Sequence, residues 1–190
     1  MIGGILAALV LGLQTHPAAG SQATCLPVDH QRNASRAWSD FEFSTEIEGG
    51  PMWLAGRGCY ARAGEAAREY LARGPLLSVR EQAITQLHLG RNLAFAGDEA
   101  AAAQAVASAR RSDLRTDGEI ALDWNAYVEG LYGFLVKDRE LLDARLESLR
   151  RSTHQGDAMN AGNLARLAAC FERSYMEAQT ASECVAAPAP

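Results

Sequence analysis

The segment from Ser78 to Arg111 constrains the fold more than any other stretch, because it predicts two helices joined by a tight turn. Ser78 and Glu81 have the spacing of a capping box, in which each residue accepts a hydrogen bond from the backbone N–H of the other. Small and apolar residues then recur at helical spacing on one face: Ala83, Leu87, Gly90 and Ala94. Gly97 ends this helix, and Asp98 is placed to cap the next one. The segment is therefore expected to form a helical hairpin.

The flanking sequence predicts imperfect copies of this hairpin. A first copy runs from Met52 to Arg73 with its turn at Gly64, and a third runs from Glu119 to Arg151 with its turn at Lys137. The three turns are spaced by 33 and 40 residues, which is typical of helical repeats. A final helix around Leu164–Phe171 and a short capping helix within Tyr175–Cys184 follow. Abundant alanine favours helices over sheets, so the expected fold class is all-α, with antiparallel hairpins stacked in a row.

Residues 1–23 have the features of a secretory signal peptide. An apolar run from Ile5 to Leu13 precedes small residues that fit a cleavage site, although no Lys or Arg stands before the run. A retained anchor or a misplaced start is the alternative. The apolar run is shorter than the roughly 20 residues that a bilayer span requires, so no integral membrane span is expected after cleavage. The expected location is periplasmic or secreted.

Four cysteines follow this leader, which fits an oxidising compartment. Four cysteines can form two disulfides in three different connectivities, and we favour the one with Cys25–Cys59 and Cys170–Cys184. The first would tie the mature N-terminus to an early helix, and the second would fasten the last helix to the tail. Free buried thiols are the alternative.

The expected organisation has four parts. After the leader, residues 24–50 are interpreted as an irregular segment that packs its aromatic residues against the first hairpin. Residues 51–184 form the helical domain, and residues 185–190 form a small-residue tail, interpreted as disordered.

The second hairpin resembles a tetratricopeptide repeat. The resemblance rests on a Leu-Gly pair, a large apolar residue three positions later, a turn glycine and two alanines: Leu89, Gly90, Leu93, Gly97, Ala102 and Ala109. The first hairpin matches weakly, the third has Lys137 at the turn, and the terminal proline of the motif is absent. The resemblance implies a short solenoid, similar to exported bacterial repeat proteins, in which Gly90 lets the second helix approach and Ala102 fills the contact.

Composition and motifs argue against several function classes. The formal net charge of −5 and the lack of a basic tract argue against nucleic acid. The histidines His30, His88 and His154 are far apart, and no zinc-type spacing occurs, so neither a metal nor a cofactor is expected. No nucleophile elbow or phosphate loop is present, so no catalytic residue is assigned and the chain is not expected to be an enzyme.

A binding surface remains, and it is the favoured interpretation. Solenoids of this kind expose their first helices on a concave face that holds peptides. The expected partner-binding residues are Arg91, Asn92, Phe95, Asn125 and Glu129. An ordinary solvated helix face is the alternative interpretation of these positions.

The favoured function is therefore an exported module that binds a peptide or protein partner. One alternative is a small envelope hydrolase with its site between the N-terminal segment and the helices; a buried ionisable cluster around His30 or His88 would support it. Another is a structural envelope protein that associates with itself.

Overall fold

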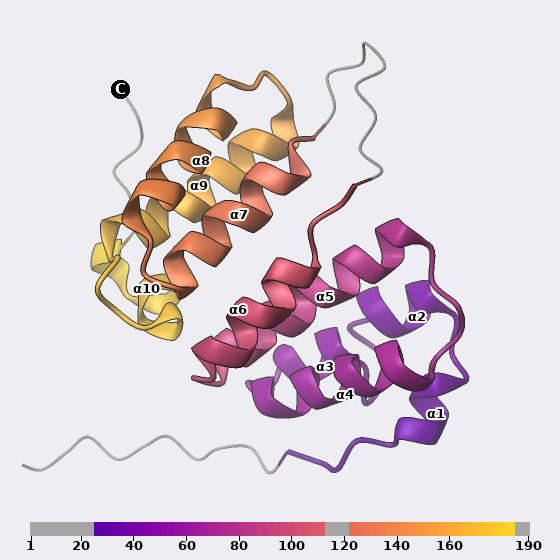
Figure 1. Cartoon of the computed structure of the whole chain (residues 1–190). Coiled ribbons are helices and arrows are strands. Elements are labelled where there is room, and N and C mark those ends of the chain that lie inside the picture. Colours follow the sequence, from indigo (N-terminus) through magenta and orange to yellow (C-terminus); the bar gives the residue numbers. More distant parts are fainter. Residues whose placement is uncertain (1–24, 113–121, 185–190) are drawn as a thin grey trace, which may run out of the picture.

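The computed structural model describes residues 25–112 and 122–184, and these residues form ten α-helices, one 3-10 helix and no strand. The bounds are α1 His30–Ala34, α2 Trp38–Phe43, α3 Pro51–Ala55, α4 Tyr60–Arg73, α5 Val79–Phe95, α6 Glu99–Ser108, α7 Trp124–Leu135, α8 Arg139–Arg151, α9 Gln155–Ala169, α10 Tyr175–Thr180 and η1 Ser182–Cys184. From α3 to α9, each helix packs against the next one in the chain, so the helices form a succession of neighbours (Figure 1). The expected all-α class is confirmed.

Some expectations fall outside the described residues. The signal peptide at residues 1–23 and the tail at residues 185–190 both lie there, as does most of the linker between the second and third hairpins. No helix in the described part of the chain is long and apolar enough to cross a membrane.

The second hairpin forms as its local signals predict. The Ser78 hydroxyl accepts from the Glu81 backbone N–H, and a Glu81 carboxylate oxygen accepts from the Ser78 backbone N–H at 2.8 Å. Gly97 has a φ of 88°, and Asp98 caps α6. The second helix ends at Ser108, short of the expected arginine pair, because the backbone N–H of Ala109 already turns back to Val106 and Ala107.

The turn between α7 and α8 repeats the turn between α5 and α6. Asp98 donates its backbone N–H to the Leu93 carbonyl, and Asp138 donates in the same way to Gly133. Each aspartate also caps the helix that follows it. Lys137 has a φ of 59°, so it adopts the left-handed conformation that Gly97 adopts in the earlier turn. The two hairpins therefore share one turn geometry with a glycine in one and a lysine in the other.

The expected turn of the first hairpin at Gly64 is wrong. Gly64 lies inside the continuous helix α4, and the chain reverses instead between α3 and α4, where Gly58 has a φ of 73°. A Cβ on Gly64 would lie 3.3 Å from Leu93 Cδ2, so this glycine serves the contact between α4 and α5. The alignment of Gly64 with Gly97 at a spacing of 33 residues does not hold.

Residues 25–50 are more ordered than the irregular segment that the sequence suggests. They contain α1 and α2, and the Phe41 ring is fully buried and stacks on Tyr70 of α4 with centroids 3.8 Å apart. Trp38, by contrast, is only partly buried. The expected packing of aromatic residues from this segment onto the first hairpin is therefore found at Phe41.

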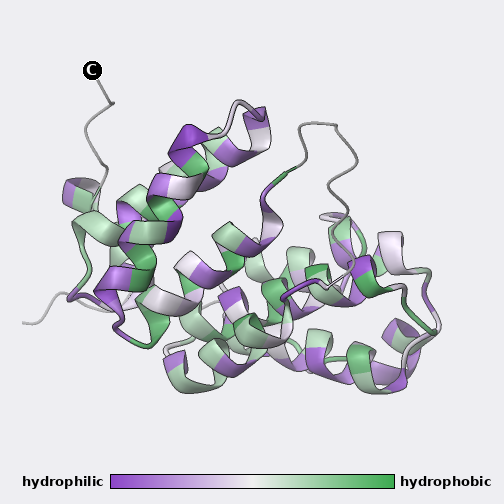
Figure 2. Ribbon diagram, turned by 45° about the horizontal axis from the view of Figure 1, so that its top comes forward, coloured by the Kyte–Doolittle hydropathy of each residue, from purple (hydrophilic) through white to green (hydrophobic). Residues whose placement is uncertain are grey.

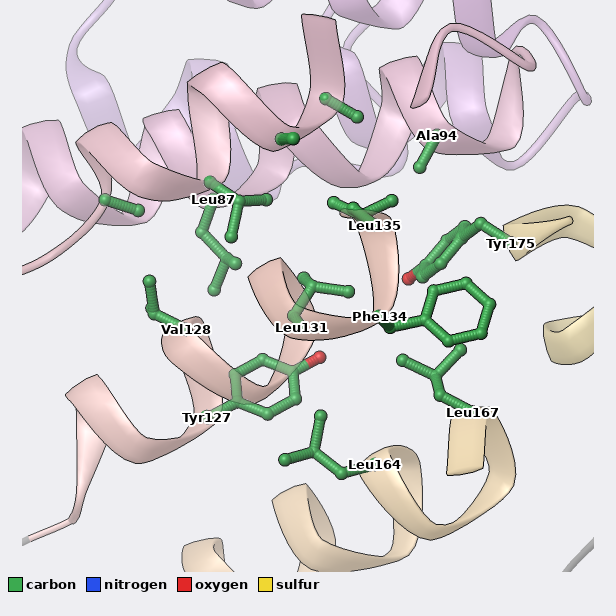
Figure 3. Close-up of a cluster of buried hydrophobic side chains, with 14 of the residues drawn as sticks. Leu87, Ala94, Tyr127, Val128, Leu131, Phe134, Leu135, Leu164, Leu167 and Tyr175 are labelled. Carbon is green, nitrogen blue, oxygen red and sulfur yellow. The ribbon is translucent and has the colours of Figure 1, made fainter. Parts of the chain in front are cut away.

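The larger hydrophobic cluster lies between the second hairpin and the C-terminal helices. Phe134 of α7 lies beside Leu167 of α9 and Tyr175 of α10, whereas Leu135 of α7 lies on the side of Ala94 of α5 (Figure 3). The helices carry hydrophilic and hydrophobic residues side by side along the ribbon (Figure 2). In α8 the buried residues are the leucines at helical spacing: Leu142, Leu146 and Leu149.

Both expected disulfides are present. Cys25 is bonded to Cys59, which joins the start of the described chain to the residue that precedes α4. Cys170 is bonded to Cys184, which joins the end of α9 to η1. Between these two cysteines, Ser174 and Glu177 form a second capping box that starts α10.

Candidate ligand-binding site

A cavity of about 380 Å³ lies where α2, α3 and the start of α4 meet α5. We call it the α5 cavity, and it is lined by Glu42, Phe43, Pro51, Met52, Ala55, Tyr60, His88, Arg91, Asn92 and Phe95. Phe43 and Met52 are exposed large apolar side chains at this cavity. Its size and its mostly apolar walls with a few polar groups are typical of small-ligand pockets.

Three of the five expected partner-binding residues meet in this cavity. Arg91, Asn92 and Phe95 follow His88 at helical spacing on α5, which places all four on one face of the helix. The Phe95 ring stacks on Tyr60 with centroids 4.6 Å apart and meets Tyr175 edge-on. One face of α5 therefore supplies three polar residues and one aromatic residue of the cavity wall.

Asn92 is buried without a hydrogen-bond partner for its side chain. The residue is only 7% exposed, and its amide makes no hydrogen bond with any residue in the described ranges. The amide atoms are not among the buried polar atoms that lack a partner, so they reach solvent through the cavity. An amide offers both donors and an acceptor, so it can pair with a ligand that enters the cavity.

Arg91 carries a largely buried positive charge. Within the described part of the chain, no carboxylate lies at ion-pair distance from its guanidinium, and its Nε has no hydrogen-bond partner. The hydroxyl of Tyr127 and then that of Tyr175 raise the pKa of Arg91, against the effect of burial. The guanidinium therefore stays charged at the edge of an apolar cavity.

A buried carboxylate orients the histidine of the cavity. Glu42 is fully buried; one of its oxygens lies 2.5 Å from His88 Nδ1, and the other accepts from the Thr85 hydroxyl at 2.8 Å. Trp38 Nε1 donates to the Thr85 hydroxyl at 3.0 Å. A carboxylate oxygen accepts the hydrogen bond from Nδ1–H, and this contact selects the tautomer in which Nε2 is the acceptor.

Asn125 lies away from the α5 cavity. Its amide donates to the Arg111 carbonyl at 2.8 Å and accepts from the Arg111 backbone N–H at 2.9 Å. Both halves of the amide are therefore used to hold the chain that follows α6 against the start of α7. Its expected role in partner binding stays a prediction.

Glu129 belongs to a different cavity. Its carboxylate pairs with Arg110 at 2.5 Å and with Arg145 at 2.6 Å, where α6, α7 and α8 enclose about 350 Å³. The two arginines place more positive than negative charge around this space. The structure thus divides the five expected residues between one shared cavity, a backbone contact and an ion-pair cluster.

A larger space of about 590 Å³ adjoins the α5 cavity. The two spaces share Tyr60 and Phe95 in their walls, and the larger one is also lined by the Cys25–Cys59 disulfide, Arg57 and Met176. Open space thus lies on both sides of the Tyr60–Phe95 stack. No group of side chains in the described residues has the composition of a metal site.

Neither a known protein-family model nor a curated protein nor a solved structure matches this chain.

Sequence reasoning missed the contribution of Glu42. Its partners Thr85 and His88 lie 43 and 46 residues away, and no local spacing connects them. The only signal in the sequence was the pattern of acidic residues among aromatic ones in residues 38–48, which is equally typical of a solvated surface.

Proposed function

We propose that the chain is an exported helical repeat protein, similar to tetratricopeptide repeats, that binds a peptide segment of a partner in the α5 cavity. The observation that carries the proposal is the unpaired amide of Asn92, which is buried but borders the cavity. A peptide backbone presents the N–H and C=O groups that such an amide pairs with.

The neighbouring residues support a peptide rather than a purely apolar ligand. Arg91 adds a cation with no carboxylate partner among the described residues, and Phe43, Met52 and Phe95 offer apolar and aromatic contacts for side chains. The adjoining space beyond Tyr60 and Phe95 provides room for a chain to continue. Together these groups match the mixture of backbone and side-chain contacts that peptide recognition uses.

Export and repeat architecture are part of the same proposal. Two disulfides support an oxidising location, since they persist in periplasmic or secreted proteins and are rare in the cytosol. The shared turn geometry at Gly97 and Lys137 supports a repeated hairpin. Removal of the first 23 residues in the native host, read by mass spectrometry of the mature protein, tests the export step.

A phage-displayed library of random linear peptides tests the binding step. Peptides selected on the wild-type protein should bind Arg91→Met and Asn92→Ala at least tenfold more weakly. Arg150→Met and Asn163→Ala change the same residue types at exposed positions and should leave binding unchanged. Selected peptides that bind all four variants equally would remove the α5 cavity as the site. Asn125→Ala is expected to lower the melting temperature, because both its hydrogen bonds to Arg111 are lost.

A further inference from the structure

The α5 cavity contains the parts of a hydrolytic site, and this goes beyond binding. Glu42, His88 and Asn92 supply an orienting carboxylate, a ring nitrogen that accepts a proton and an unpaired amide donor. His88 and Asn92 stand one helical turn apart on the same face of α5. We propose that the cavity hydrolyses an ester of a short apolar acid, with His88 as the general base.

Glu42 determines which ring nitrogen of His88 acts as the base. Glu42 accepts from Nδ1 of His88, which fixes the tautomer in which Nε2 is the acceptor. Nε2 makes no hydrogen bond within residues 25–112 and 122–184, and the side chain is 23% exposed. A ring nitrogen that accepts a proton, held in place by a buried carboxylate, is the arrangement that general base catalysis requires.

The nucleophile is water. The residues that line the cavity include no serine, threonine or cysteine, the usual nucleophiles of acyl transfer. His88 Nε2 takes a proton from water while the water oxygen forms a bond to the acyl carbon. The carbonyl oxygen becomes an oxyanion, which accepts a hydrogen bond from the Asn92 amide.

The second half of the reaction returns the proton. The bond between the acyl carbon and the alkoxy oxygen breaks, and the imidazolium gives its proton to the departing alkoxide. The products are a carboxylic acid and an alcohol, and His88 is neutral again. No oxidant, reductant or other reactant is needed besides water.

The walls define the substrate class. Phe43, Met52 and Phe95 suit an apolar acyl group, and a cavity of about 380 Å³ limits its length. Arg91 lies beside this site, and its positive charge disfavours a cationic substrate. The same charge attracts the carboxylate of the product. A short-chain ester such as 4-nitrophenyl butyrate therefore serves as the probe.

A second His–Glu pair on the same molecule provides the matched control. His30 Nε2 contacts Glu65 at 3.0 Å, but His30 lines none of the three cavities described above. His30→Gln should keep the wild-type rate of butyrate release. His88→Gln should lower kcat/KM about 100-fold, which is the scale of general base catalysis.

Two further variants separate catalysis from folding. Asn92→Ala removes no hydrogen bond from the fold, so it should keep the melting temperature and lower kcat with little change in KM. Glu42→Gln tests the positioning role of the carboxylate. Proton transfer to His88 should make the wild-type reaction slower in D2O than in H2O, and this solvent isotope effect should be smaller in Glu42→Gln. Added imidazole should restore activity to His88→Ala and not to Asn92→Ala.

The results that would overturn the inference are distinct. Equal rates for wild-type and His88→Gln, an equal loss in His30→Gln, or full activity in Asn92→Ala would each end it. A wild-type rate that does not exceed that of the same concentration of free imidazole would do the same. Peptide selection by the protein depends on neither result, so the binding proposal is judged separately.

Discussion

Gly90 of α5 lies directly against Val106 of α6, so closely that a Cβ on Gly90 would stand 2.5 Å from Val106 Cγ2. The same Cβ would lie 3.0 Å from the Ala102 carbonyl oxygen. We expect Gly90→Ala to destabilise the protein by about 1–3 kcal/mol, because the two helices must separate to admit the methyl group. Urea denaturation followed by circular dichroism measures this change.

Gly162 in α9 provides the control for that substitution. Nothing lies within 4 Å of a Cβ placed there, so Gly162→Ala adds a better helix former without a clash. We expect it to stabilise the protein by about 0.5–1 kcal/mol. A loss of stability equal to that of Gly90→Ala would contradict the close contact between α5 and α6.

The C-terminal disulfide should contribute strongly to stability. Cys170 and Cys184 close a loop with a sequence separation of 14 residues, and a bridge of that length is worth about 3 kcal/mol by chain entropy. The double substitution Cys170→Ser and Cys184→Ser should therefore lower the melting temperature under non-reducing conditions. A protein in which Cys25 and Cys59 are both replaced by serine retains the C-terminal bridge. Excess reductant should therefore destabilise that protein by the same amount as the Cys170→Ser and Cys184→Ser substitutions destabilise the wild type.

Lys137 links the α7–α8 turn to the chain beyond α9. Its amino group donates to the carbonyls of Phe171 and Arg173 at 2.9 and 2.8 Å. Lys137→Met should cost about 2 kcal/mol, since hydrogen bonds from a charged group are lost. Lys137→Gly should cost less, because glycine relieves the left-handed backbone conformation. Arg150→Met on the exposed face of α8 should change the unfolding free energy little, and a similar loss there would refute the role of the two carbonyl contacts.

Stability should fall at alkaline pH because of Tyr175. Burial raises the pKa of its phenol from 10.0 to about 12 in the folded protein. A folded-state pKa above the unfolded value gives stability that is complete below pH 10 and is lost as the pH rises toward 12. Each tenfold difference in proton affinity between the folded and unfolded states corresponds to about 1.4 kcal/mol of unfolding free energy.

Denaturation midpoints measured between pH 9 and about pH 11 test this expectation. Tyr175→Phe has no phenol to ionise, so its stability should fall less over the same range. Tyr70 has a pKa raised to about 12 by burial and then by Glu42, so part of the wild-type decline should remain in this variant. An identical decline in both proteins would assign the effect to Tyr70 alone.

Local signals in the sequence predicted the features that depend on neighbouring residues. Ser78 and Glu81 form their capping box, and Gly97 and Asp98 form the turn, because every partner lies within a few positions along the chain. These features follow from hydrogen-bond geometry that needs no knowledge of distant contacts. The two disulfides span 34 and 14 residues, and the favoured pairing joins neighbours in cysteine order.

Features that depend on distant residues were predicted less well. A glycine marks either a turn or a close helix contact, and Gly64 proved to be the second because Leu93 packs against it. Three cavity residues on α5 were expected from the resemblance to a tetratricopeptide repeat, whereas Glu42 reaches the cavity only through the packing of α2. Asn125 holds the Arg111 backbone through both halves of its amide, and no local spacing in the sequence connects these two residues.

The connectivity of the disulfides bears on how the chain matures. Cys25 pairs with Cys59, and Cys170 pairs with Cys184, so each cysteine is joined to its nearest neighbour in cysteine order. In a chain that emerges N-terminus first, both cysteines of the first bridge emerge before the third cysteine appears. An oxidant that joins cysteines in order of emergence therefore produces the native bonds without a rearrangement step.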